Sequence, residues 1–172
     1  KQGNIIMENI TFNQFTNAEF NLFNGNPILY NPWNSFVIAD PSVLTPDISH
    51  DGKWHLFCHT FMGVYRYESN DGINFKNTGK IVSRAMRPNI NYIDGKYYLF
   101  YERTRPIIFN LLSLVGAKWE SEIYCVESTD LKEWSKPYLV IGKTREYEEY
   151  KKGYAISNPF LINTGNGYRM YY

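Results

Sequence analysis

An internal repeat constrains this chain more than any other feature of its sequence. The segment DGKWHLF at residues 51–57 returns as DGKYYLF at 94–100, and SNDGINF at 69–75 returns as STDLKEW at 128–134. Short aromatic and β-branched segments separated by Asp-Gly turns are typical of antiparallel strands. A unit that recurs in this way must be identified before a fold is named, and here it predicts a series of small sheets.

Each unit begins with a proline segment: ADPSV at 39–43, MRPNI at 86–90 and SNPFL at 157–161. The third unit continues to residue 172, where the sequence stops within a predicted strand. The second unit is longer than the first because of an apolar insertion over about residues 106–121. Four antiparallel strands per unit, at a period of about 40–50 residues, is the pattern of β-propeller blades. We therefore predict an all-β fold whose blades number more than this chain supplies.

Composition narrows the class of partner. The 172 residues include 18 Lys+Arg and 17 Asp+Glu, a net charge of +1, which disfavours nucleic acid or an anionic membrane as the partner. No segment approaches the roughly 20 apolar residues of a membrane-spanning helix. The sequence has no signal-peptide pattern and does not begin with Met, so the compartment stays open, with the cytoplasm slightly favoured. Cys58 and Cys125 lie in apolar segments and are predicted to be buried free thiols.

The segments at 39–43 and 52–57, together with NPIL at 26–29, resemble the five-bladed β-propeller glycosidases of glycoside hydrolase families 43 and 32. These families include arabinanases, xylosidases and invertases. The segment STDLKEWS at 128–135 is similar to the outer hairpin of their blades. The resemblance covers about residues 26–172 and implies a partial propeller domain of about two and a half blades. The expected parts are an N-terminal segment (1–25) and blades at about 26–84, 85–142 and, incomplete, 153–172.

The resemblance also implies candidate catalytic residues. Members of that group use one Asp as base or nucleophile, a second Asp that tunes the acid, and a Glu as the acid. Asp40 stands at the first of these positions, whereas Arg87 and Asn158 stand at the second and third. Glu102, near the end of the second strand of its unit, is a candidate to supply the missing acid, because a buried carboxyl can protonate a leaving group.

Four residues are candidate substrate-binding groups. Trp33, just before Asp40, offers an aromatic surface for a sugar, and His59 occupies the place of a substrate-contacting Gln in invertase-like members. Arg87 presents a fork of donors suited to a negatively charged group such as phosphate. Asn158 completes the set.

Structural roles for the same residues stay open. Asp-Pro sequences start turns, so Asp40 and Asn158 are also explained as turn residues. Arg87 is equally explained as a partner in an ion pair, and Glu102 and His59 as polar residues at strand ends. Aromatic side chains such as Trp33 also fill cores.

No cofactor or metal site is predicted. His55 and His59 lie four residues apart on an expected strand, about 13 Å from each other, which is too far to share one ion. The sequence thus favours a glycosidase-like propeller that acts on a glycosidic bond. The alternative is a propeller that binds a carbohydrate or a partner without catalysis, and a transferase or phosphorylase on the same scaffold is a third class. The rest of a propeller, or a second chain, is expected to cover the exposed blade surfaces.

Overall fold

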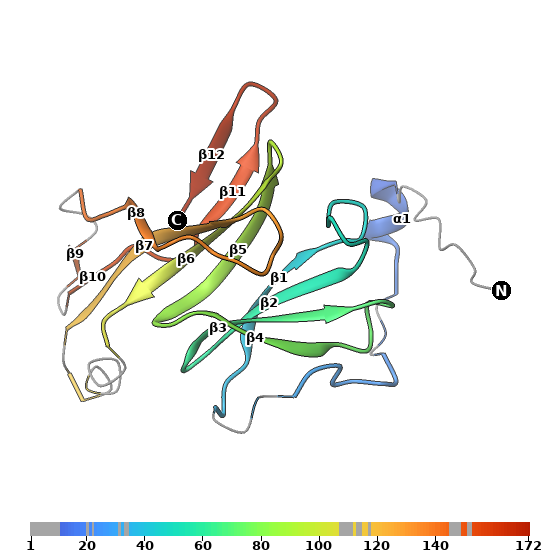
Figure 1. The fold of residues 1–172 in the computed structure, drawn as a ribbon, viewed down its shortest axis with the longest axis horizontal. Coiled ribbons are helices and arrows are strands. Elements are labelled where there is room, and N and C mark those ends of the chain that lie inside the picture. Colours follow the sequence, from blue (N-terminus) through green and yellow to red (C-terminus); the bar gives the residue numbers. More distant parts are fainter. Residues whose placement is uncertain are drawn as a thin grey trace.

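The computed structural model describes residues 11–19, 21, 23–30, 32, 35–106, 112, 115–116, 118–144, 149–150 and 153–172. Two sheets stand side by side, and a short hairpin near the C-terminus follows the second sheet (Figure 1). The one described helix, α1 (Phe12–Thr16), is short and precedes both sheets. The predicted all-β organisation is confirmed.

The first sheet is antiparallel, with its strands in sequence order. It consists of β1 (Ala39–Leu44), β2 (Trp54–Thr60), β3 (Gly63–Ser69) and β4 (Lys76–Val82).

The second sheet repeats this arrangement and then extends it. Its antiparallel part consists of β5 (Ala85–Ile93), β6 (Lys96–Thr104), β7 (Trp119–Ser128) and β8 (Tyr138–Ile141). Two short strands, β10 (Gly153–Ala155) and β9 (Glu149–Tyr150), continue it, with β10 parallel to the first residues of β7. The final hairpin is β11 (Phe160–Asn163) with β12 (Tyr168–Tyr171).

The two outer turns share one hydrogen-bond pattern, which explains why their Ser-x-Asp sequence recurs. Ser69 Oγ accepts two backbone N–H groups at 3.0 and 3.2 Å, and Asp71 Oδ1 accepts two more at 2.8 and 2.9 Å. Ser128 Oγ accepts at 2.9 and 3.2 Å, and Asp130 Oδ1 at 2.8 and 2.9 Å. Short polar side chains that bond to the following backbone are a standard way to close such turns.

The two sheets pack face to face. Phe57 of β2 and Val64 of β3 are fully buried against Leu99 of β6 and Leu131 of the β7–β8 loop. The opposite face of β2 is buried as well, where Leu56 packs in a separate apolar cluster with Leu29 and Ile38, which precede β1. Strand β2 therefore has apolar side chains on both faces, as its sequence predicts, because it lies between two layers.

A repeated polar contact joins successive units. In the first two proline segments, the side chain of the fourth residue accepts a hydrogen bond from the backbone N–H of the fifth residue of the next segment. Ser42 Oγ accepts from the N–H of Ile90 at 3.0 Å, and Asn89 Oδ1 accepts from the N–H of Leu161 at 3.0 Å. These bonds set the position of each innermost strand relative to the next.

The prediction of two buried free thiols is confirmed, whereas the apolar insertion is shorter than expected. Cys58 and Cys125 are buried and free, as predicted. The expected insertion ends earlier than residue 121, because residues 119–121 already belong to β7, where they pair with β10 and where Ser121 also pairs with Thr104 at the end of β6. Much of that insertion lies outside the described residues. Within the described part of the chain, no helix is long and apolar enough to cross a membrane.

The contact between Ser42 and Ile90 yields a stability prediction. In a Ser42→Ala variant the N–H of Ile90, a residue only 6% exposed, loses its acceptor. An unsatisfied buried N–H costs about 1–3 kcal/mol, so we expect the free energy of unfolding to fall by that amount in urea titrations. Ser83→Ala is the matched control: Ser83 is exposed, and its change is expected to stay within about 0.5 kcal/mol. Equal effects of the two substitutions would contradict the role of this bond.

Candidate functional site

Three equivalent positions of the repeat have the same unusual backbone. Asp40, Arg87 and Asn158 each precede a proline and have φ angles of 50°, 49° and 53°. The register of the β1–β2 ladder shifts at the first position and that of the β5–β6 ladder at the second. A left-handed conformation costs a non-glycine residue on the order of 1–3 kcal/mol, and such residues cluster at functional sites. The irregularity redirects the side chains of Asp40 and Arg87 away from regular strand pairing.

The Asp40 carboxylate is the most exposed group of a cluster that also contains His59, Arg87 and Glu102. Its Oδ2 lies 3.2 Å from Nδ1 of His59 and 3.9 Å from Nε of Arg87. About half of the side chain (49%) remains exposed. Within the described residues, the other oxygen, Oδ1, has no hydrogen-bond partner. Asp40 is therefore held through one oxygen and presents the other to solvent.

His59 is the buried neighbour of Asp40, placed there by the pairing of Ala39 with His59 across β1 and β2. Burial lowers the pKa of His59, an effect that the Asp40 charge opposes only in part. The imidazole is consequently neutral at pH 7. Its Nδ1 also lies 3.4 Å from the backbone N of Arg87, and this nitrogen either donates to Asp40 or accepts from Arg87.

Glu102 is the fully buried charge of the cluster. Its side chain is 0% exposed, and its Oε2 forms an ion pair with Nη1 of Arg87. Its Oε1 accepts a hydrogen bond from the indole N–H of Trp119 at 3.2 Å, a donor shared with Ser121 Oγ at the same distance. Burying a carboxylate is costly unless a cation and further donors compensate it, and Arg87 and Trp119 provide both.

Trp119 is held by the parallel pairing of β10. A Cβ on Gly153 would lie 1.8 Å from the carbonyl oxygen of Trp119, and the φ of Gly153 is +133°. Only glycine fits there. Sequence reasoning missed Trp119 because it lay inside the expected insertion; the strand-like alternation that follows it, up to Ser128, was the available signal.

The structure brings together four of the predicted site residues: Asp40, His59, Arg87 and Glu102. Asn158 shares their backbone geometry, but its described contact is with the Ser157 hydroxyl at 3.5 Å. Trp33 lies outside the described residues.

Among the described residues, no group of three or more His, Cys, Asp or Glu side chains is arranged to hold a metal ion. The cluster contains two carboxylates and one guanidinium, and its His59 is neutral, so its formal charge is negative.

Comparison with solved structures identifies the fold. An endo-arabinanase of glycoside hydrolase family 43 from Bacillus licheniformis matches with a TM-score of 0.55 and 21% identity, over 76% of this chain and 44% of that one. An arabinanase from Bacillus subtilis matches with a TM-score of 0.55 and 20% identity, over 74% and 44%. A xylan β-1,4-xylosidase from Bacillus halodurans matches with a TM-score of 0.53 and 20% identity, over 83% and 25%. No family model and no curated protein matches the sequence.

The chain thus spans less than half the length of each of these proteins. Its two four-stranded units and the final hairpin correspond to about two and a half blades of the five-bladed propeller of family 43 glycosidases. The expectation of a partial propeller of this type is confirmed.

The burial of His59 yields a pH prediction. A depressed pKa means that the unfolded chain binds a proton near pH 6.5 while the folded protein does not. Stability is therefore fully present above pH 6.5 and falls below it, by up to about 1.4 kcal/mol per pH unit for one imidazole. His55, whose pKa burial also lowers, adds to the same trend.

We expect urea titrations between pH 7.5 and 5 to show this loss, and a His59→Gln variant to lose stability less steeply. In NMR titrations the His59 ring should change state below pH 6.5. A midpoint above 6.5 would mean that the attraction of Asp40 outweighs burial.

Proposed function

We propose that this chain is part of a carbohydrate-acting propeller of the glycosidase type, with Asp40 as the group that faces the sugar. The observation that carries the proposal is the half-exposed Asp40 carboxylate, held through Oδ2 and open at Oδ1. The propeller fold adds support, because its solved neighbours are named as arabinanases and a xylosidase. A carboxylate held in this way is suited to accept a proton from water or to attack an anomeric carbon.

The charge of the cluster favours a neutral ligand. The guanidinium of Arg87 already faces Glu102 and lies near Asp40, so little of its charge remains for a phosphate or another anion. A neutral sugar with hydroxyl donors suits a site with excess negative charge better than an anionic substrate does. This weighs against a phosphorylase or phosphate-using transferase, and it assigns Arg87 to orienting Asp40.

Glu102 is better suited to position Arg87 than to act as the acid. Both of its oxygens are occupied, by Arg87 and by Trp119, and the side chain is inaccessible to a leaving group. Glycoside hydrolysis needs a second carboxyl on the opposite side of the scissile bond. In our proposal that acid is a group other than Glu102.

The second candidate function is carbohydrate binding without hydrolysis. It is favoured by one observation: of the three positions with the same pre-proline geometry, only Asp40 is a carboxylate. A site with one exposed carboxylate and a neutral imidazole can hydrogen-bond sugar hydroxyls without completing the catalytic pair.

An Asp40→Asn variant separates these functions. We expect hydrolysis of arabino- and xylo-oligosaccharides by the chain to fall about 100-fold to 10,000-fold, with calorimetric binding of the same oligosaccharides changed only a few-fold. Asp94→Asn is the control, since Asp94 is exposed, has a φ of 48° and lies in the β5–β6 turn away from the cluster. Full hydrolysis by the Asp40 variant would refute the proposed role. If the unmodified protein binds these oligosaccharides but hydrolyses neither kind, and if Asp40→Ala weakens that binding, the second function is supported.

A Glu102→Gln variant tests positioning against acid catalysis. A missing acid slows substrates with poor leaving groups far more than aryl glycosides, whose phenolate leaves without protonation. A displaced Arg87 slows both classes equally and leaves the shape of the pH–rate profile unchanged. We expect the equal loss. Selective rescue by a nitrophenyl glycoside would instead identify Glu102 as the acid.

A further inference from the structure

A second candidate site lies between the two sheets, where the outer strands of the first meet the β7–β8 loop of the second. A cavity of about 370 Å³ opens there. Its polar lining consists of Arg66, Thr78 and Lys80 from the first sheet and Lys132 from the second. None of these residues belongs to the Asp40 cluster, which is built on β1, β2, β5, β6 and β7.

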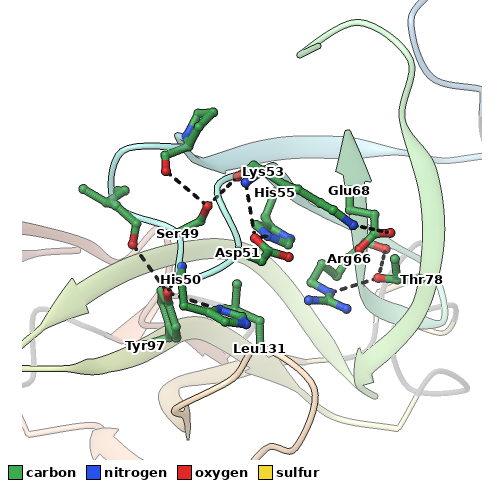
Figure 2. Close-up of polar contacts among 12 residues, drawn as sticks. Ser49, His50, Asp51, Lys53, His55, Arg66, Glu68, Thr78, Tyr97 and Leu131 are labelled. Carbon is green, nitrogen blue, oxygen red and sulfur yellow. Dashed lines mark hydrogen bonds and ion pairs between the residues drawn. The ribbon is translucent and has the colours of Figure 1, made fainter. Parts of the chain in front are cut away.

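Arg66 is the central residue of this cavity, and its side chain is fixed in place. A register shift in the β3–β4 ladder leaves Thr78 as an extra residue beside Arg66. The Thr78 hydroxyl accepts a hydrogen bond from Nε of Arg66 at 2.9 Å and donates one to the Arg66 carbonyl oxygen at 3.0 Å (Figure 2). The bulge thus positions Thr78 to orient the guanidinium.

Arg66 is also a buried cation without a counter-ion. The residue is only 8% exposed, yet among the described residues no carboxylate lies within ion-pair distance of it. Its Nη1 and Nη2 likewise have no hydrogen-bond partner in the described part of the chain, and neither is fully buried, so both can be reached through the cavity. Burial lowers the pKa of Arg66. A buried charge in this condition is unfavourable unless a partner of opposite sign arrives.

The nearby carboxylates are engaged elsewhere. Three of them attract Arg66 from a distance: Asp51, Glu68 and Asp130. Asp51 bonds to His55 Nε2 at 2.8 Å (Figure 2), and Glu68 pairs with the partly buried Lys53 at 3.3 Å. Asp130 accepts backbone N–H groups in its own turn. These carboxylates reduce the positive electrostatic potential in the cavity. They leave Nη1 and Nη2 of Arg66 without a hydrogen-bond partner in the described part of the chain.

Two lysines, one from each sheet unit, also line this cavity. Lys80 on β4 and Lys132 in the β7–β8 loop are both exposed. Neither has an ion-pair partner among the residues that the structure describes. Three cations therefore line one cavity in a chain whose net charge is only +1.

We propose that this cavity binds a tetrahedral oxyanion, phosphate or sulfate, either free or as an ester on a small molecule. The planar fork of Arg66 bonds two oxygens through Nη1 and Nη2, and the Lys80 and Lys132 ammonium groups neutralise the remaining charge. A dianion with four oxygens matches three cations better than a carboxylate with two oxygens does. The bound anion supplies the counter-ion that Arg66 lacks and links the two sheets.

The test is calorimetric titration of the 172-residue protein with inorganic phosphate and with sulfate, at an ionic strength held constant with chloride. We expect saturable binding that a Lys80→Gln/Lys132→Gln double variant weakens at least tenfold. Both side chains are exposed, so this variant is expected to fold. Lys136→Gln is the matched control, because Lys136 is exposed near the same loop and does not line the cavity. Asp40→Asn should leave binding unchanged.

Two further arms complete the experiment. Arg66→Lys keeps the charge but removes the fork, and it should weaken binding more than Lys132→Gln alone does; its unfolding curve shows whether the variant is folded. Ribose 5-phosphate distinguishes an ester from the free ion: tighter binding than inorganic phosphate indicates an ester, and equal binding indicates the ion. The absence of saturable binding to the unmodified protein, or equal losses in the double variant and Lys136→Gln, would overturn the proposal.

Discussion

The face-to-face packing of the two sheets is the constraint on which both sites depend. One face of the first sheet is pressed against the second, and this face includes Phe57 in the middle of β2. On the same face, His59 lies toward one end of β2, and Arg66 lies opposite Phe57 on β3. Loss of the apolar core would therefore separate His59 of the first sheet from Arg87 of the second, the two partners of Asp40, and would open the cavity around Arg66.

Two buried charges at the interface between the sheets differ in how they are compensated. Glu102 is buried with Arg87 and Trp119, so its charge is compensated within the protein. Arg66 is buried between the Thr78 hydroxyl and a cavity, and the described part of the chain provides no counter-ion for it. Since an uncompensated buried charge is unfavourable, the first arrangement is expected of a structural pair and the second of a site that receives a ligand.

Much of the fold could be predicted from the repeat. The strand segments, the Ser-x-Asp turns and the apolar residues on both faces of β2 follow from local patterns with short sequence separation. The candidate cluster was partly accessible, because Asp40 and Arg87 occupy the same position of the repeat. A strand at Trp119 could have been predicted from the alternation that follows it, but the role of Trp119 could not, since it depends on β10, a strand that pairs in parallel with β7 from about 30 residues away and that only Gly153 permits.

The sequence by itself determined that the chain forms repeated antiparallel units with a proline segment at the start of each, because turns and strand alternation are encoded locally. It also placed an acid, a base and an amide at equivalent positions in Asp40, Arg87 and Asn158. Only the tertiary structure decided which of these side chains is free. Glu102 pairs with Arg87, Asp40 keeps an open oxygen, and Arg66 has no counter-ion in the described part of the chain. That outcome depends on distances and burial between strands of different units, which no local pattern specifies.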